Sequence, residues 1–144
     1  MRVALVGLAA LICTYSTPAI AQQSAMKPGP MWNAARIDVL DGQTENYLDW
    51  LSKTWAANQA FAKTQGWLLD YHILESVNPR DGEPDIILIT TFADYPSATE
   101  SERRNDIINK RMQQDDHTAD AASGQRGSMR KLMGSVLYRE LKPR

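Results

Sequence analysis

Four ionisable side chains stand at alternate positions in two segments: Arg36 and Asp38 in the first, Asp70 and His72 in the second. Alternate residues of a strand point to one side of a sheet, so two such strands would bring all four to one surface. Histidine is the residue type best suited to general acid/base catalysis at neutral pH, so His72 is the sharpest single candidate. Either carboxylate would orient it, and Arg36 would hold an anionic substrate or stabilise an enolate or phenolate. The alternative is that the three charged residues form ion pairs at a dimer interface, with His72 satisfied beside them.

The last apolar segment, 134–141, offers further polar candidates. Tyr138 and Glu140 share one face, while Arg139 lies on the other. The alternation alone does not say which face looks inward. If Leu137 and Leu141 pack against helices, Tyr138 and Glu140 turn toward the cavity. Tyr138 would then donate a proton or bind a phenolic ligand, although such a tyrosine is more often a half-buried strand residue.

Three large apolar residues fall on the same faces as these polar groups: Trp32, Leu68 and Leu74. We expect them to line the substrate pocket. Trp32 would stack on an aromatic substrate, or it would belong to the core or to a dimer interface. Trp55 and Trp67 are assigned to the hydrophobic core.

Several other kinds of chemistry are disfavoured. The sequence shows no phosphate-binding loop, Gly-rich dinucleotide turn or nucleophile elbow. The acidic group around His117 (Asp115, Asp116 and Asp120) matches no metal-ligand spacing, so neither a metal nor a cofactor is expected. The net charge of −1 gives no basic field for nucleic acid. Haem degradation fits poorly, because His72 is the only histidine on an expected strand and the expected second helix, before Asp115, contains no histidine.

Residues 1–21 are typical of a secretory signal peptide. Arg2 precedes the apolar run 3–12, and the small residues Ala19 and Ala21 form a cleavage site. Ile12 before Cys13 argues against a lipoprotein. Cleavage would remove that single cysteine, which suits an oxidising compartment. We therefore expect a periplasmic or secreted protein with no membrane attachment after signal cleavage.

The remaining chain has a simple order of expected elements. A Pro/Gly-rich flexible lead-in at 22–30 precedes one domain at 31–144. Strands are expected at 31–40, 67–76, 85–92 and 134–141, helices at 43–64 and 97–114, and a polar break at 115–127. This β-α-β-β-α-β order is the ferredoxin-like arrangement of the α+β class, with helices on one face of a four-stranded antiparallel sheet.

In this order and hydrophobic rhythm the chain resembles the dimeric α/β-barrel superfamily. The resemblance covers residues 31–141 and is carried by the segments MWNAARIDVL, YLDWLSKTWAANQAFAKTQG, PDIILITTFADY and GSVLYREL. It implies a homodimer with sheet packed against sheet, and a pocket between each sheet and its helices or within the barrel. Members include cofactor-free monooxygenases, isomerases and lyases, haem-degrading enzymes and proteins without known activity, so the fold alone does not select a reaction.

These observations together predict a cofactor-independent enzyme of the isomerase, lyase or monooxygenase type. It would act by acid/base proton transfer on a hydrophobic, aromatic compound. His72 would be the acid or base, Arg36 the anion holder, Asp38 or Asp70 the orienting group and Tyr138 an auxiliary donor. The alternative is a non-catalytic homodimeric module that binds a small ligand or is purely structural.

Overall fold

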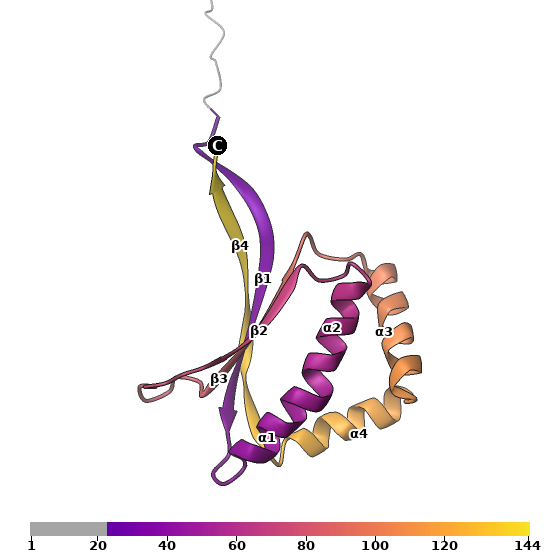
Figure 1. Ribbon diagram of the computed structural model, residues 1–144. Coiled ribbons are helices and arrows are strands. Elements are labelled where there is room, and N and C mark those ends of the chain that lie inside the picture. Colours follow the sequence, from indigo (N-terminus) through magenta and orange to yellow (C-terminus); the bar gives the residue numbers. More distant parts are fainter. Residues whose placement is uncertain (1–22) are drawn as a thin grey trace, which may run out of the picture.

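Four strands form one antiparallel sheet in the computed structural model, which describes residues 23–144. Their order across the sheet is β2-β3-β1-β4 (Figure 1), so β1 and β3 are central and β2 and β4 are the edges. The strands are β1 (Met26–Val39), β2 (Asp70–Glu75), β3 (Ile86–Phe92) and β4 (Arg130–Pro143). The predicted α+β class and four-stranded antiparallel sheet are confirmed.

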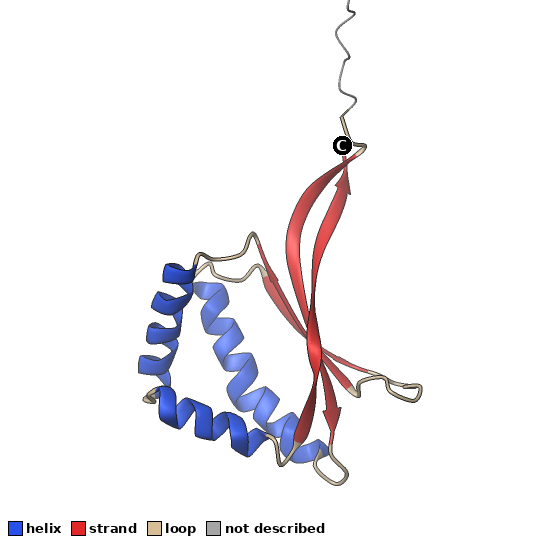
Figure 2. Cartoon of the chain, turned by 180° about the vertical axis from the view of Figure 1, so that it is seen from behind, coloured by secondary structure: helices blue, strands red, loops and turns tan. Residues whose placement is uncertain are grey.

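The helices lie on one face of this sheet, as the two opposite views show (Figures 1 and 2). The first is a continuous rod made of α1 (Thr44–Trp50), a π-helical turn η1 (Leu51–Trp55) and α2 (Ala56–Thr64). After β3 come α3 (Ala98–Met112) and α4 (Asp116–Arg126).

Helix α4 corrects the predicted polar break and adds an element to the expected order. The segment 115–127 lacks an apolar stripe, but Asp115 begins a helix there. Its carboxylate accepts a hydrogen bond from the backbone N–H of Thr118 at 2.8 Å, and the Thr118 hydroxyl accepts one from the backbone N–H of Asp115 at 2.9 Å. This reciprocal cap satisfies backbone donors at the helix start without any buried face.

Three strand boundaries also differ from expectation, and in one of them β4 begins at Arg130 rather than at Gly134. Strand β1 begins at Met26 inside the predicted lead-in, because residues 26–28 pair with residues 141–143 of β4. Strand β2 begins at Asp70 rather than at Trp67, so residues 67–69 form the approach to the sheet. The predicted signal peptide at 1–21 lies outside the described residues.

The hydrophobic core occupies one end of the space between sheet and helices. Ile37, Ile86 and Leu88 from the sheet pack with Tyr47 and Leu51 from the first helical rod, and each is less than 8% exposed. The alternation of β1 places Ile37 on this side, as predicted. Helix α3 contributes no buried residue, so the expected burial of Ile107, Ile108 and Met112 is wrong.

The opposite face of the sheet, here called the open face, lies away from all described helices (Figure 2). The strand register arranges it in three rows. The rows are Asp70–Thr91–Trp32–Tyr138, His72–Ile89–Ala34–Val136 and Leu74–Ile87–Arg36–Gly134. Ile87 and Ile89 of the central strand β3 also point to this face, so the apolar sequence of β3 places large side chains on both faces of the sheet.

Strands β1 and β4 continue together beyond the rest of the sheet as a two-stranded ribbon (Figure 1). At its tip the backbone N–H of Arg144 donates to the carbonyl of Ala25 at 3.1 Å. None of the helices in the part of the chain described here is long and apolar enough to cross a membrane.

Candidate functional site

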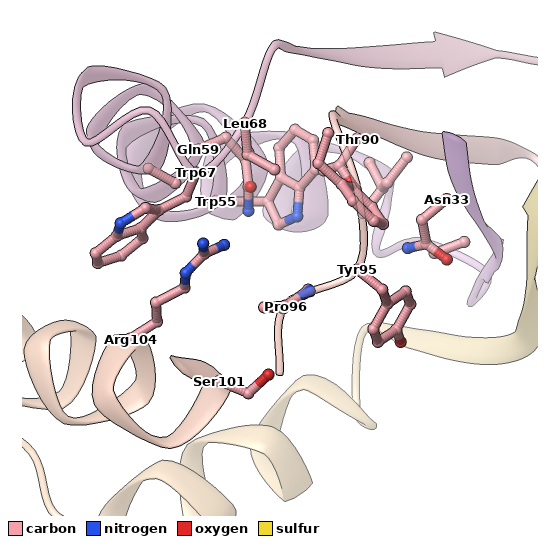
Figure 3. A pocket seen from close by; sticks show the side chains of 14 residues that line it. Asn33, Trp55, Gln59, Trp67, Leu68, Thr90, Tyr95, Pro96, Ser101 and Arg104 are labelled. Carbon is pink, nitrogen blue, oxygen red and sulfur yellow. The ribbon is translucent and has the colours of Figure 1, made fainter. Parts of the chain in front are cut away.

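A cavity of about 460 Å³ lies between the sheet and helices α2 and α3 (Figure 3), and we call it the interlayer pocket. This volume falls in the range of small-molecule sites. Its lining combines aromatic, aliphatic and uncharged polar side chains with one arginine. The residues are Asn33, Ala35, Trp55, Gln59, Ala62, Trp67, Leu68, Leu88, Thr90, Phe92, Tyr95, Pro96, Ser101 and Arg104.

The pocket exists because the core stops short of this end of the sheet. Along β1 the side facing the helices changes from Ile37, which is 1% exposed, to the small Ala35 and then to Asn33. Ala62 lines the pocket from α2, a segment that contributes no buried residue. Small side chains on both layers leave the space unfilled.

The π-helical turn decides which residues of the first helical rod reach the pocket. A π-turn adds one residue to a helical turn and rotates the residues that follow. Tyr47 before it and Leu51, its first residue, are buried in the core, whereas Trp55, its last residue, and Gln59 beyond it line the pocket. Leu48, which the sequence placed on the buried stripe, is 39% exposed.

The aromatic walls are held by other aromatic rings. Trp55 meets Tyr71 edge-on with ring centroids 5.8 Å apart, and Phe92 meets Tyr95 at the same distance. Trp67 meets Phe61 in the same way. Such edge-to-face pairs fix ring orientation in addition to burying area. The predicted core residues Trp55 and Trp67 are therefore partly buried wall residues of a pocket.

Arg104 is the charged group of the pocket. It reaches from α3 toward the Trp67 ring, with its guanidinium carbon 5.4 Å from the centroid (Figure 3). Its Nε donates to Glu100 at 2.6 Å, and Glu100 also accepts from Arg103 at 2.7 Å. Hydrogen bonds first from Arg103 and then from Arg104 lower the pKa of Glu100 to about 2. The ion pair between Arg104 and Glu100 uses only Nε of Arg104, so the two Nη groups can donate hydrogen bonds to a ligand.

The other polar lining groups are amides and hydroxyls, which can donate or accept hydrogen bonds but are not acids or bases near neutral pH. Asn33 and Thr90 come from the sheet, Gln59 from α2 and Ser101 from α3. Within residues 23–144, no His, Asp, Glu or Lys lines this pocket. The arrangement therefore suits recognition of a planar, largely apolar ligand with a carbonyl or carboxylate group.

The predicted site residues lie on the other side of the sheet. Arg36 and Tyr138 line a hollow of about 370 Å³ on the open face, together with Glu83 and Pro84. An Nη of Arg36 donates to the carbonyl of Gly82 at 3.2 Å. This hollow brings together one predicted anion-binding group and one predicted proton donor.

His72 and Asp70 share the open face but lie outside that hollow. Nε2 of His72 is 3.9 Å from a carboxylate oxygen of Asp70, and both side chains are nearly half exposed. A hydrogen bond from Lys63 at 3.0 Å lowers the pKa of Asp70. The register places His72 and Arg36 two strands and two residues apart, which corresponds to roughly 12 Å between their Cα atoms.

The apolar candidates are divided between the two faces. Trp32 and Leu74 lie on the open face, where Leu74 is 49% exposed and the indole N–H of Trp32 is buried without a partner among the described residues. Leu68 is a correction, because it lines the interlayer pocket instead. It precedes β2, so the strand alternation that grouped it with Asp70 and His72 does not apply to it.

The last two candidates lie toward opposite ends of β1. Asp38 stands opposite Lys131 in the β1–β4 register. Glu140 lies beside Gly29 and is 3.7 Å from Nζ of Lys142. Neither lines the hollow around Arg36. Three of the five predicted catalytic residues, Asp38, Asp70 and His72, thus lie outside it.

Arg104 and Gln59 were not predicted from the sequence as residues of this pocket. The sequence favours solvated charge for Arg103, Arg104, Arg126, Arg130 and Lys131, with an anion entrance as the alternative, and it does not single out Gln59. A usable signal was the run of Trp55, Gln59 and Ala62 on one side of the helix, where an amide and a small residue follow a tryptophan. Within residues 23–144, no group of three or more His, Cys, Asp or Glu side chains is placed to hold a metal ion.

Comparison with known proteins identified no relative of this chain. No protein-family model matches the chain, and neither the curated proteins nor the solved structures give a significant match.

Proposed function

We propose that this protein binds a small aromatic molecule bearing a carbonyl or carboxylate group in the interlayer pocket. The observation that carries the proposal is the joint lining of one 460 Å³ cavity by Trp55, Trp67, Tyr95 and Arg104. Aromatic walls favour a flat ring, and an arginine with two available Nη groups favours an oxygen acceptor. Apolar cavities with a few convergent polar groups are the usual form of ligand sites.

Binding is better supported than catalysis in this pocket. Proton transfer needs a group that titrates near the working pH within hydrogen-bond reach of the substrate. The polar lining from the described chain consists of amides, hydroxyls and one arginine. The pocket therefore supports the alternative of a small-ligand-binding module.

Intrinsic tryptophan fluorescence tests this proposal, because Trp55 and Trp67 line the pocket. Benzoate, benzaldehyde and phenol are titrated into the protein and into Arg104→Gln. We expect saturable quenching in the wild-type protein. Arg104→Gln should bind benzoate about tenfold more weakly, because it loses one charged hydrogen-bond donor. Arg103→Gln is the matched control, since Arg103 also bonds Glu100 and stands 5.8 Å from Trp67 but does not line the pocket. Equal losses in both variants, or no saturable quenching, would contradict the proposal.

A second candidate is acid/base chemistry on the open face by a cofactor-independent enzyme of the isomerase, lyase or monooxygenase type. It is favoured by the common placement of His72, Asp70, Arg36 and Tyr138 on one face. That face also carries apolar side chains that a soluble protein normally covers, such as Val136, which is 41% exposed. We propose that a second copy covers it, as in a ferredoxin-like dimeric barrel.

Light scattering and turnover test this second candidate separately. A dimer that Val136→Glu disrupts, while Leu48→Glu on α1 does not, supports coverage of the open face. Loss of turnover in His72→Ala with the dimer intact supports catalysis, measured on aromatic aldehydes and ketones. A monomeric wild-type protein would contradict the proposal that a second copy covers the open face. Unchanged turnover in His72→Ala would contradict the assignment of His72 as the acid or base.

We also propose a periplasmic or secreted location, supported by the signal-peptide pattern of residues 1–21. The mass of the exported protein should correspond to a chain that begins at Gln22. A full-length mass in the cytoplasmic fraction would contradict this.

A further inference from the structure

Two arginines at the junction of α4 and β4 stand over a stacked aromatic pair. The rings of Tyr47 and Trp50 are parallel within 11°, with centroids 5.7 Å apart. The guanidinium carbon of Arg126 lies 5.1 Å from the Trp50 centroid, and that of Arg130 lies 5.8 Å from the Tyr47 centroid. Among residues 23–144, neither arginine forms an ion pair with a carboxylate.

Three hydrogen-bond donors in this cluster are buried without an acceptor. They are Nε of Arg126, Nε of Arg130 and the hydroxyl of Tyr47, for which no described atom of the chain serves as a partner. Tyr47 as a whole is 0% exposed. Buried donors in folded proteins are nearly always matched, by protein, water or ligand. The two guanidinium groups can only donate, so an acceptor that carries negative charge would suit them, and Arg126 is the member of the cluster that lines a cavity.

The electrostatics of the cluster favour the same kind of partner. Burial lowers the pKa of Arg126, and the charge of Arg130 lowers it further. Burial raises the pKa of Tyr47, although the charges of Arg130 and Arg126 oppose this shift. The two guanidinium groups and the hydroxyl are therefore within electrostatic reach of one another. An anion bound beside Arg126 would offset the repulsion between the two arginines.

Arg126 also opens onto a second cavity, of about 450 Å³, between the first helical rod and helices α3 and α4. It is the only charged residue among the described residues that line this cavity. The other polar walls include the amides of Asn58, Gln59, Gln114 and Gln125. Trp55 and Gln59 also line the interlayer pocket, so the two cavities share a wall.

We propose that the Arg126 end of this second cavity binds a small oxyanion, a carboxylate or a phosphate group. Arg126 makes the direct contact, because its planar guanidinium offers paired N–H donors to two oxygens. Arg130, which lies over the Tyr47 ring, adds positive potential. Amides such as Gln125 supply further donors. This site is separate from the interlayer pocket and does not depend on the function proposed for it.

Thermal unfolding in three sodium salts tests the site: chloride, phosphate and acetate at equal ionic strength and pH 7. Acetate supplies a carboxylate without the aromatic ring for which the interlayer pocket is proposed. At ten times the dissociation constant of a bound anion, the melting temperature should rise by about 5 °C over chloride. Isothermal titration with the same salts gives the affinity directly. A response to phosphate or to acetate supports the site and names the preferred group. A response to neither overturns it.

Arg126→Gln separates an anion site from a purely structural brace. We expect Arg126→Gln to lose the anion-dependent rise in melting temperature. In chloride it should keep the wild-type melting temperature, because the substitution removes a charge that Arg130 repels. Arg111→Gln is the matched control, since Arg111 also lies in the last turn of a helix and over an aromatic ring, 4.5 Å from Phe61, but outside the cavity. The control should keep the rise.

Two results would overturn the proposal. One is an equal anion response in Arg126→Gln and in the wild-type protein. The other is an equal loss of melting temperature in all three salts, which would assign Arg126 to packing on Trp50. If Arg126→Gln does not fold, Arg126→Lys keeps the charge and loses the paired donors. That variant should bind the anion about tenfold more weakly, and unchanged affinity would count against the site.

Discussion

Replacing Tyr47 with phenylalanine should increase the free energy of unfolding. The side chain is 0% exposed, and its hydroxyl is buried without a partner among the described residues. A buried hydroxyl without a hydrogen bond costs about 1–3 kcal/mol, and Phe keeps the ring that stacks on Trp50 at 5.7 Å. We therefore expect Tyr47→Phe to stabilise the protein by about 1 kcal/mol in chloride buffer.

Urea denaturation at pH 7 measures this change. With a slope of about 2 kcal/mol per M, a gain of 1 kcal/mol moves the midpoint up by about 0.5 M at unchanged slope. Tyr95→Phe is the control, because Tyr95 is 66% exposed and its hydroxyl meets water. Tyr47→Phe lowering the midpoint by a similar amount would refute the reasoning, since it would show that the hydroxyl is hydrogen-bonded in the folded protein.

Three further predictions concern the core, the sheet and the pH response. Ile37→Ala, at a site 1% exposed, should lower the free energy of unfolding by about 3 kcal/mol, whereas Val77→Ala, at 92% exposure, should leave the urea midpoint unchanged. Gly134→Ala should cost about 1–2 kcal/mol in thermal unfolding, because φ there is +110° and β4 changes register beside it; an unchanged melting temperature would contradict this. Hydrogen bonds from Arg103 and Arg104 lower the pKa of Glu100 from 4.5 to about 2, so its stabilising contribution is complete above pH 4.5 and is lost as the pH falls toward 2. Glu100→Gln should flatten that part of the stability profile, and an identical acid profile would count against the pairing.

The sheet was the more predictable part of this fold. Alternation over 31–39 depends only on side chains of one strand, and it assigned Ile37 to the helix side correctly. A long apolar run likewise marked β3 as a central strand. Helix α4 was missed because its stability comes from the cap at Asp115 and not from an apolar stripe. A polar segment with a cap and several alanines gives no periodic signal.

The candidate sites were less predictable, because a cavity depends on what neighbouring layers fail to fill. Alternation placed Arg36 and His72 on one face and left the face of Tyr138 open, and it carries no information on distances across strands. Trp67 has the size and hydrophobicity of a core residue. It lines a pocket only because α3 is separated from the sheet. The π-turn that directs Trp55 to the pocket has no simple sequence signature.

The hydrogen bond from Arg144 to Ala25 brings two remote parts of the chain to the same point. A short glycine-serine linker would therefore join them without strain, and new termini could be opened at Val77 in the exposed turn between β2 and β3. In such a circular permutant, β3 and β4 would keep their neighbours in the sheet but would be synthesised before β1 and β2. Residues 23–28 and 139–144 of this ribbon tip line neither cavity, so a reporter domain attached there would leave both accessible.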